Sequence, residues 1–229
     1  MTDPHFVPQR PPAARTGDTI VLTGADLTIA DVEAVARHGA VAALDVHARA
    51  RMQEARDVID RLVAEGAVVY GVTTGFGALA DRSIAPADAE RLQENLLISH
   101  AVGVGEPLAR DVVRAMLLLR ANTLALGHSG ARPLIVDRLL DFLRLGVHPV
   151  VPAQGSVGAS GDLAPLAHLA LPLVGRGAVE LNGHETPALV ALREVGLGPL
   201  TLGPKEGLAL LNGTQLMSAL GALLLADAD

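Results

Sequence analysis

The chain has 229 residues, half of them hydrophobic, with a formal net charge of −7 and no cysteine. At about 150 residues per domain this length fits one or two domains, and the apolar content excludes a disordered chain. The lack of cysteine excludes disulfide frameworks, thiolate nucleophiles and iron–sulfur clusters. The acidic balance is the opposite of what binding to phosphate backbones requires, so we expect no nucleic-acid partner.

The N-terminal segment differs from the rest of the chain. Residues 1–18 contain four prolines and two arginines, but no apolar run of the kind found in secretory signals. We therefore predict a flexible arm over residues 1–18, a folded unit over residues 19–229 and a cytoplasmic location.

The early elements of the folded unit are predicted from strand propensity and capping signals. A short strand is expected at residues 19–22, and Thr28 with Asp31 forms the capping-box start of a helix. A second helix is expected over residues 45–65. The β-prone run at residues 68–74 leads into a glycine loop and predicts a further strand.

Further along, prolines mark helix starts and glycines mark helix ends. The predicted helices cover residues 86–102, 107–126, 133–145 and a final helix from residue 204. Before the final helix, Asn182-Gly183 predicts a tight hairpin. The fold class is therefore mainly α, with a few short strands and glycine-rich loops.

The final helix contains an uncharged stretch, residues 207–226, that is long enough to span a bilayer. Asn212 and other polar or glycine residues interrupt it, so a buried core helix is favoured and no membrane partner is expected. The apolar character continues almost to residue 229 without a capping glycine. We therefore expect either a longer protein or a second subunit that covers this helix.

The most unusual stretch is the small-residue loop at residues 154–161, which leads into a helix that Asp162 is predicted to cap. A phosphate-binding loop would need a Lys-Ser or Lys-Thr pair after the glycines, and this loop has none. A hydrolase elbow would need Gly-x-Ser-x-Gly, but Gly161 follows Ser160 directly. On composition alone, a flexible loop without chemistry remains open.

Ala159-Ser160-Gly161 offers another possibility, in which the backbone cyclises. If the Gly161 nitrogen attacks the Ala159 carbonyl, a five-membered ring closes, and loss of two waters leaves a methylene on the former Ser160. Glycine permits the close approach, alanine leaves the carbonyl uncrowded and serine supplies the leaving hydroxyl. The product is an electrophile that needs no metal or added cofactor, and the start of the following helix would raise its reactivity.

Residues 158–166, Gly-Ala-Ser-Gly-Asp-Leu-Ala-Pro-Leu, resemble the signature of the aromatic amino-acid ammonia-lyases. Three further motifs occur in that family's order, at residues 70–77, 95–105 and 206–214. The resemblance covers residues 20–229. It implies the N-terminal portion of the family's fumarase/aspartase-like helical fold, with the helical bundle incomplete. It also implies a homotetramer and a 4-methylideneimidazol-5-one group formed from Ala159, Ser160 and Gly161.

The resemblance also assigns roles to individual residues. Tyr70 matches the family tyrosine that removes the β proton of the substrate, although a phenol near pKa 10 needs a site that lowers that value or couples the phenol to a neighbour. The pair Ser99-His100 matches positions associated with substrate choice and is similar to histidine ammonia-lyases, which favours L-histidine. Asn212 matches an asparagine that contacts the substrate and the prosthetic group, and Leu208, one turn earlier, is expected to line the pocket.

Three other features carry less weight. Gly75-x-Gly77-x-x-Ala80 superficially resembles a dinucleotide fingerprint, but the next helix begins too late, so no nucleotide cofactor is expected. The histidines show no metal-ligand spacing, and no metal is expected. His128 departs from the tyrosine that many family members carry, which affects local packing more than chemistry.

Three functions stay open. The first is histidine ammonia-lyase, which converts L-histidine to trans-urocanate and ammonia. The second is a phenylalanine or tyrosine ammonia-lyase, or an aminomutase, with the same prosthetic group. The third is a catalytically silent fragment that needs a partner chain, because the family's carboxylate-binding arginine lies in helices that this sequence lacks. We expect no urocanate from the chain alone.

Overall fold

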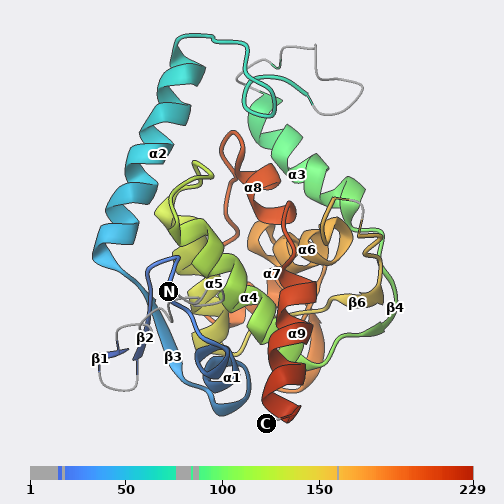
Figure 1. Cartoon of the computed structure of the whole chain (residues 1–229). Coiled ribbons are helices and arrows are strands. Elements are labelled where there is room, and N and C mark those ends of the chain that lie inside the picture. Colours follow the sequence, from blue (N-terminus) through green and yellow to red (C-terminus); the bar gives the residue numbers. More distant parts are fainter. Residues whose placement is uncertain (1–14, 17–18, 76–83, 85–87, 159, 229) are drawn as a thin grey trace, which may run out of the picture.

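In the computed structural model, the described residues are 15–16, 19–75, 84, 88–158 and 160–228. Most of the predicted arm lies outside these ranges, and so do Ala159 and the loop residues Phe76, Gly77 and Ala80. Within the described ranges the chain is mainly helical, as predicted (Figure 1).

The helices and strands divide into a helical body and three small sheets. The helices are α1 (Ile29–His38), α2 (Val46–Ala64), α3 (Ala89–His100), α4 (Arg110–Ala125), α5 (Pro133–Leu145), α6 (Leu163–Ala170), α7 (Ala188–Glu194), α8 (Glu206–Leu211) and α9 (Gln215–Ala228). The first sheet joins β1 (Arg15–Thr16), β2 (Thr19–Leu22) and β3 (Val41–Leu44). The second joins β4 (Val104–Pro107) to β6 (Pro152–Gln154), and the third joins β5 (His148–Pro149), β7 (Ala178–Leu181) and β8 (His184–Pro187).

The core is built around α4, which lies near the centre of the molecule (Figure 1). This helix packs against α1, α5 and α9, and its apolar residues from Val112 to Leu118 are buried. Because neighbours surround it, α4 is apolar on most of its sides rather than along a single stripe. One charged residue, Arg120, lies within this buried surface and is only 3% exposed.

Local sequence signals predict several boundaries correctly. The side chain of Thr28 accepts a hydrogen bond from the Asp31 amide, and the Asp31 side chain accepts one from the Thr28 amide, so the capping box of α1 is confirmed. α5 begins at Pro133 and ends before Gly146, which adopts a left-handed φ of +68°. The predicted hairpin at Asn182-Gly183 joins β7 to β8.

The predicted strand at residues 68–74 is wrong. Residues 68–73 form an irregular turn, in which the Val69 carbonyl accepts from the amides of Val72 and Thr73. The Thr73 hydroxyl donates to the Ala67 carbonyl and closes the turn. Strand propensity depends on partners across the sheet, and these amides bond within the turn instead.

The single helix predicted from residue 204 is also wrong, because two helices occupy this segment. α8 ends at Leu211, the next residue Asn212 has an extended conformation with ψ of 105°, and α9 begins at Gln215. Asn212-Gly213 is a turn signal, and here it overrides the surrounding apolar run.

α9 buries one side only. Ala219 and Leu223 are buried where α9 packs against α1 and α4, whereas Met217 and Leu224 are 59% and 67% exposed. By length and composition alone, residues 206–228 are apolar enough to cross a membrane. The burial expected for the whole helix therefore holds for one face.

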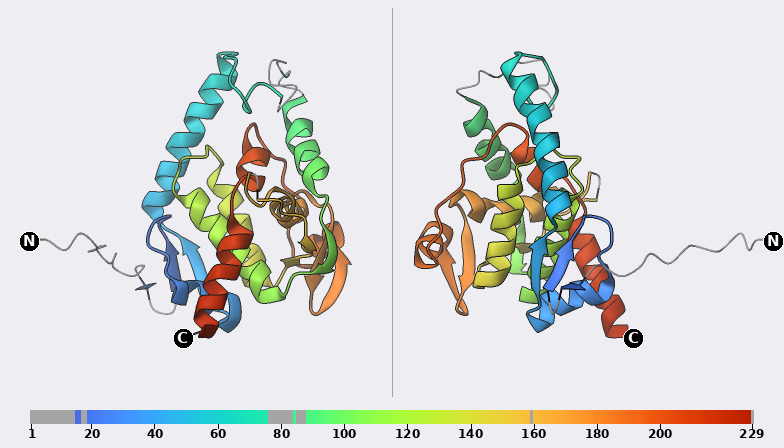
Figure 2. Two further views of the ribbon diagram at one scale, coloured as in Figure 1. Left: turned by 45° about the vertical axis from the view of Figure 1, so that its right-hand side comes forward. Right: turned by 90° about the vertical axis from the view of Figure 1, so that its left-hand side faces the viewer.

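The arrangement of the upper helices positions the loop that contains Ser160. α2 and α3 rise on opposite sides of the molecule, with α8 between them (Figures 1 and 2). α3 packs against α6 and α8. β4, which follows α3, pairs with β6, which directly precedes the loop. This pairing brings the end of α3 next to residues 155–158 and 160–161.

Candidate active site

A pocket of about 290 Å³, called the Ser160 pocket below, lies where the end of α3 meets the loop of residues 154–161, called the Ser160 loop. Its lining includes His100 from α3 and Ser160 and Gly161 from the loop. The Gly103 amide donates to Nε2 of His168 at 3.0 Å, and this contact between residues 65 positions apart fixes the segment after α3 against α6. The structure thus places His100, Ser160 and Gly161 around one pocket.

Gly161 has a conformation that excludes other residues. Its φ of +88° is left-handed, and a Cβ at this position would lie 2.3 Å from the carbonyl oxygen of Gly213. The amide of the next residue, Asp162, donates to the same oxygen at 2.7 Å. The loop is therefore bound directly to the break between α8 and α9.

Asp162 precedes the first residue of α6, but its side chain does not cap that helix. The buried carboxylate instead accepts from the Ser156 hydroxyl at 2.9 Å and from the Met217 amide at 3.0 Å. Met217 lies in the first turn of α9, where helix amides have no partner in their own helix. The expected side-chain cap is therefore wrong, and the carboxylate joins the loop to α9.

His100 ends α3, and its Nδ1 lies 2.9 Å from the Leu96 carbonyl oxygen. A carbonyl oxygen only accepts, so this contact favours the neutral tautomer that carries its proton on Nδ1 and leaves Nε2 as the acceptor, although the Ser99 hydroxyl also lies 3.1 Å from Nδ1. The Ser99 hydroxyl donates to the same carbonyl at 3.0 Å. These contacts orient the ring and supply the pocket with an imidazole that accepts a hydrogen bond.

Leu208 and Asn212 line a different pocket, of about 330 Å³, together with His128 and Lys205. Asn212 is exposed at the end of α8 and is not enclosed in an apolar helix, as the sequence had suggested. Lys205 donates to a backbone carbonyl at 2.9 Å, and burial lowers its pKa. Neither Leu208 nor Asn212 is among the described residues that line the Ser160 pocket.

Tyr70 lies in the turn that follows α2 and is 59% exposed. It is not among the described residues that line the Ser160 pocket. Within this chain, the structure therefore does not bring Tyr70 and Ser160 to one cavity.

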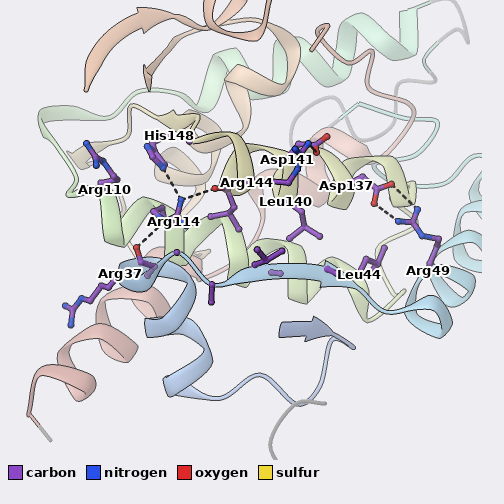
Figure 3. A pocket seen from close by; sticks show the side chains of 18 residues that line it. Arg37, Leu44, Arg49, Arg110, Arg114, Asp137, Leu140, Asp141, Arg144 and His148 are labelled. Atoms are coloured by element: carbon purple, nitrogen blue, oxygen red, sulfur yellow. Dashed lines mark hydrogen bonds and ion pairs between the residues drawn. The ribbon is translucent and has the colours of Figure 1, made fainter. Parts of the chain in front are cut away.

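A larger cavity, of about 900 Å³, lies between β3 and the helices α4 and α5 (Figure 3). Its lining is rich in arginine, but several guanidinium groups are paired with carboxylates, as Arg49 is with Asp137. Arg114 donates to backbone carbonyls at the ends of α1 and α5 and contacts Nε2 of His148 at 3.2 Å. These arginines have structural partners within the chain, and the cavity lies apart from Ser160.

Two groups that hold the Ser160 loop were missed in the sequence. Ser156 bonds to Asp162, and Arg120 lies next to Gly213. The available signal for Arg120 was a charged residue within the apolar run Ala115–Ala125. Burying a guanidinium is costly unless acceptors pair with it, so such a residue indicates polar contacts inside the core. Here Nη1 and Nη2 have acceptors, while Nε has none among the described residues.

Comparison with known proteins identifies the family. The family model for aromatic amino acid lyases matches residues 27–229. A histidine ammonia-lyase from Symbiobacterium thermophilum is 58% identical over 206 residues, which cover 90% of this chain and 41% of that relative. The chain thus spans about two fifths of the length of this relative.

Solved structures agree with the mainly helical fold. Ergothionase from Treponema denticola has a TM-score of 0.87 at 34% identity, covering 91% of this chain and 42% of the other. Tyrosine aminomutase from Streptomyces globisporus has a TM-score of 0.85 at 38% identity, and the match covers 91% of this chain and 39% of the aminomutase chain. Because the family model matches residues 27–229, which is most of the chain, the chain belongs to the aromatic amino acid lyase family.

Proposed function

We propose that this chain carries the electrophile-forming part of a histidine ammonia-lyase, which converts L-histidine to trans-urocanate and ammonia. One observation carries the proposal. Gly161 is held in a left-handed conformation against the Gly213 carbonyl, while Ser160 lines the same pocket as His100. The 58% identity to a histidine ammonia-lyase supports the reaction class.

The residues present fit a 4-methylideneimidazol-5-one group formed from Ala159, Ser160 and Gly161. Ring closure needs a backbone nitrogen that can approach closely. A Cβ at position 161 would collide with the Gly213 carbonyl oxygen, so only glycine fits there. When formed, such a group supplies an electrophilic carbon to the substrate. Ser160 is exposed at the pocket, so the carbon derived from it is accessible.

His100 is proposed to select the substrate. With the proton on Nδ1, its Nε2 can accept a hydrogen bond, and the imidazole of L-histidine has an N–H that donates one. A phenyl ring offers no such donor and would leave the polar group unpaired, which costs binding free energy. The contact therefore favours L-histidine over L-phenylalanine.

Tyr70 is proposed as the base that takes the β proton, with Asn212 and Leu208 as substrate contacts. These three residues lie outside the Ser160 pocket of this chain, and Tyr70 is exposed at the surface. We therefore propose that neighbouring subunits of a homotetramer complete the site. A cytoplasmic location and a single folded unit over residues 19–229 belong to the same proposal.

A phenylalanine or tyrosine ammonia-lyase, or an aminomutase, is the second candidate. The fold supports each of these activities, since a tyrosine aminomutase superposes closely on this chain. The pair Ser99-His100 is the feature that favours L-histidine.

The intact mass of the purified chain tests whether the electrophile forms. We expect the unchanged chain to be lighter than its sequence by two waters and the Ser160→Ala variant not to show that deficit. If the unchanged chain keeps its full mass, the proposed function is wrong.

A chimera tests the substrate, because this chain spans 41% of the Symbiobacterium relative. Residues 27–229 would replace the matching segment of that protein. We expect urocanate from L-histidine and deamination rates at least tenfold lower for L-phenylalanine and L-tyrosine. In the His100→Leu chimera, the ratio between the rate for L-histidine and the rates for the other two amino acids should be smaller. Faster deamination of the other two amino acids would favour the second candidate.

A further inference from the structure

The break between α8 and α9 is held by one buried cation. The guanidinium of Arg120 donates to the backbone carbonyls of Ala209 and Asn212 and to the side-chain oxygen of Gln215. None of its hydrogen-bond partners among the described residues is a carboxylate. Burial lowers the pKa of Arg120 to about 10, so the side chain stays protonated at neutral pH.

These acceptors are groups that the ends of helices leave without partners. The last carbonyls of α8 have no donor within their own helix, and Gln215 is the first residue of α9. Thr123, one turn after Arg120 on α4, accepts from Nε2 of Gln215 at 3.2 Å. α4 therefore determines where the backbone of the break lies.

Gly213 is enclosed between Arg120 and the Ser160 loop. A Cβ on Gly213 would lie 2.4 Å from Nη1 of Arg120 and 2.2 Å from the Gln215 side-chain oxygen. The Gly213 carbonyl oxygen meets the loop, because it accepts from the Asp162 amide and lies 2.3 Å from the position of a Cβ on Gly161. The guanidinium, the Gly213 backbone and the Gly161 backbone are thus in successive contact, with no side chain between them.

We propose that Arg120 is a positioning residue for formation of the electrophile, because it sets the Gly213 carbonyl against which Gly161 is held. The inference rests on the proposed function. Without the guanidinium, two carbonyls lose their donor and a space opens beside Gly213. The break can then move away, and Gly161 has room to leave its left-handed conformation.

The reaction that Arg120 positions is a cyclisation with loss of two waters. The Gly161 nitrogen bonds to the Ala159 carbonyl carbon, whose oxygen leaves as water with the amide protons of Gly161 and Ser160, and a C=N bond remains. The Ser160 hydroxyl leaves as the second water with the proton of its Cα, which creates the methylene. No oxidant or co-reactant is consumed, and Arg120 acts only on the geometry.

The test compares the intact masses of purified Arg120→Met and Arg114→Met chains. Arg114 is a matched control, because it lies on the same helix and donates to backbone carbonyls at the ends of α1 and α5. Far-UV circular dichroism verifies that helix content is retained. We expect the unchanged chain and Arg114→Met to lose two waters, and the fraction of Arg120→Met chains that loses them to fall at least tenfold.

Arg120→Lys separates positioning from general stability. A lysine keeps the charge but lacks the forked donors of a guanidinium, so we expect partial ring formation, between Arg120→Met and the unchanged chain. If Arg120→Met is recovered only as insoluble protein, Arg120→Lys carries the test. A mass distribution equal to that of the unchanged chain would then overturn the inference.

Other outcomes are also decisive. Full loss of two waters in Arg120→Met overturns the positioning role and leaves the proposed function standing. An equal defect in Arg114→Met overturns it as well, since that would show a general loss of stability. Full mass for the unchanged chain overturns both proposals. If the masses of the unchanged chain and its Arg120 and Arg114 variants differ as expected while the chimera forms no urocanate, the result counts against the proposed function alone and supports the role of Arg120.

Discussion

Two glycines are required at the candidate site for different reasons. Gly161 adopts a left-handed φ of +88°, whereas Gly213 is glycine because its neighbours leave no space for a Cβ. A glycine at position 161 was expected from the Ala-Ser-Gly tripeptide, because the proposed cyclisation needs a close approach of its nitrogen, but its left-handed φ was not predicted. The requirement at Gly213 was not predictable, because it depends on Arg120 and Gln215, which only the folded chain brings together.

Gly213→Ala is expected to prevent ring closure. The added methyl group would lie 2.2 Å from the Gln215 side-chain oxygen and 2.4 Å from Arg120, so the backbone of the break must shift. We expect the purified variant to keep its full mass. Gly221→Ala is the matched control, because a Cβ there meets open space in α9, and this variant should lose two waters. Loss of two waters in Gly213→Ala would contradict the prediction.

Among the elements, helices with strong local signals were predictable and the α8–α9 break was not. Pro133 and Gly146 mark the limits of α5, and a capping box marks the start of α1. At the break, the apolar run of residues 207–226 masks the turn signal of Asn212-Gly213. The geometry of the break depends on the contact between Arg120 and the Asn212 carbonyl, which are 92 positions apart. No local sequence pattern indicates a contact between residues so far apart in the sequence.

The start of α8 depends on a buried carboxylate. Glu206 is fully buried and accepts from the amide and guanidinium of Arg132 and from the Gly203 amide. Glu206→Gln preserves the size of the side chain but leaves Arg132 without its counter-charge. We expect the free energy of unfolding, measured with denaturant, to fall by about 3 kcal/mol.

Glu180→Gln provides the comparison for Glu206. Glu180 pairs with Arg110, whose side chain is 56% exposed. Solvent screens such a pair, so we expect its loss to cost less than about 1 kcal/mol. Similar losses in the two variants would show that the contacts of Glu206 do not stabilise α8 in the way we infer.

In the whole molecule, α4 links two regions that have different roles. Arg114 lies beside the arginine-lined cavity (Figure 3), while Arg120 supports the break next to the Ser160 loop. The helical architecture was predictable through four motifs that resemble one family, and the structural comparisons confirm it. The pairing of β4 with β6 was not, because these short strands are far apart in sequence and carry no local signal of their partner.

Global stability is expected to fall in mild acid because of His148. The residue is 8% exposed, and burial, together with the charge of Arg114, lowers its pKa to about 4. Arg110 adds to this lowering and Glu180 opposes it. Since the unfolded chain takes up this proton near pH 6.5, stability is lost as the pH falls from about 6.5 to about 4.

Denaturant unfolding near pH 7 and near pH 4.5 measures this dependence. We expect His148 to account for a loss of at most about 3 kcal/mol, from the size of the pKa shift. His148→Asn cannot take up the proton, so its stability should change less over the same interval. An equally steep dependence in His148→Asn would assign the effect to other groups.

The supports of the Ser160 loop are synthesised late. Asp162 bonds to Met217, which follows it by 55 positions, and Gly161 rests against Gly213. A ribosome adds residues from the N-terminus, so the tripeptide is made well before the backbone that holds it. On the proposed function, we therefore expect the electrophile to form only after α9 has been translated and has packed. Nascent chains released before Met217 are expected to retain the serine hydroxyl.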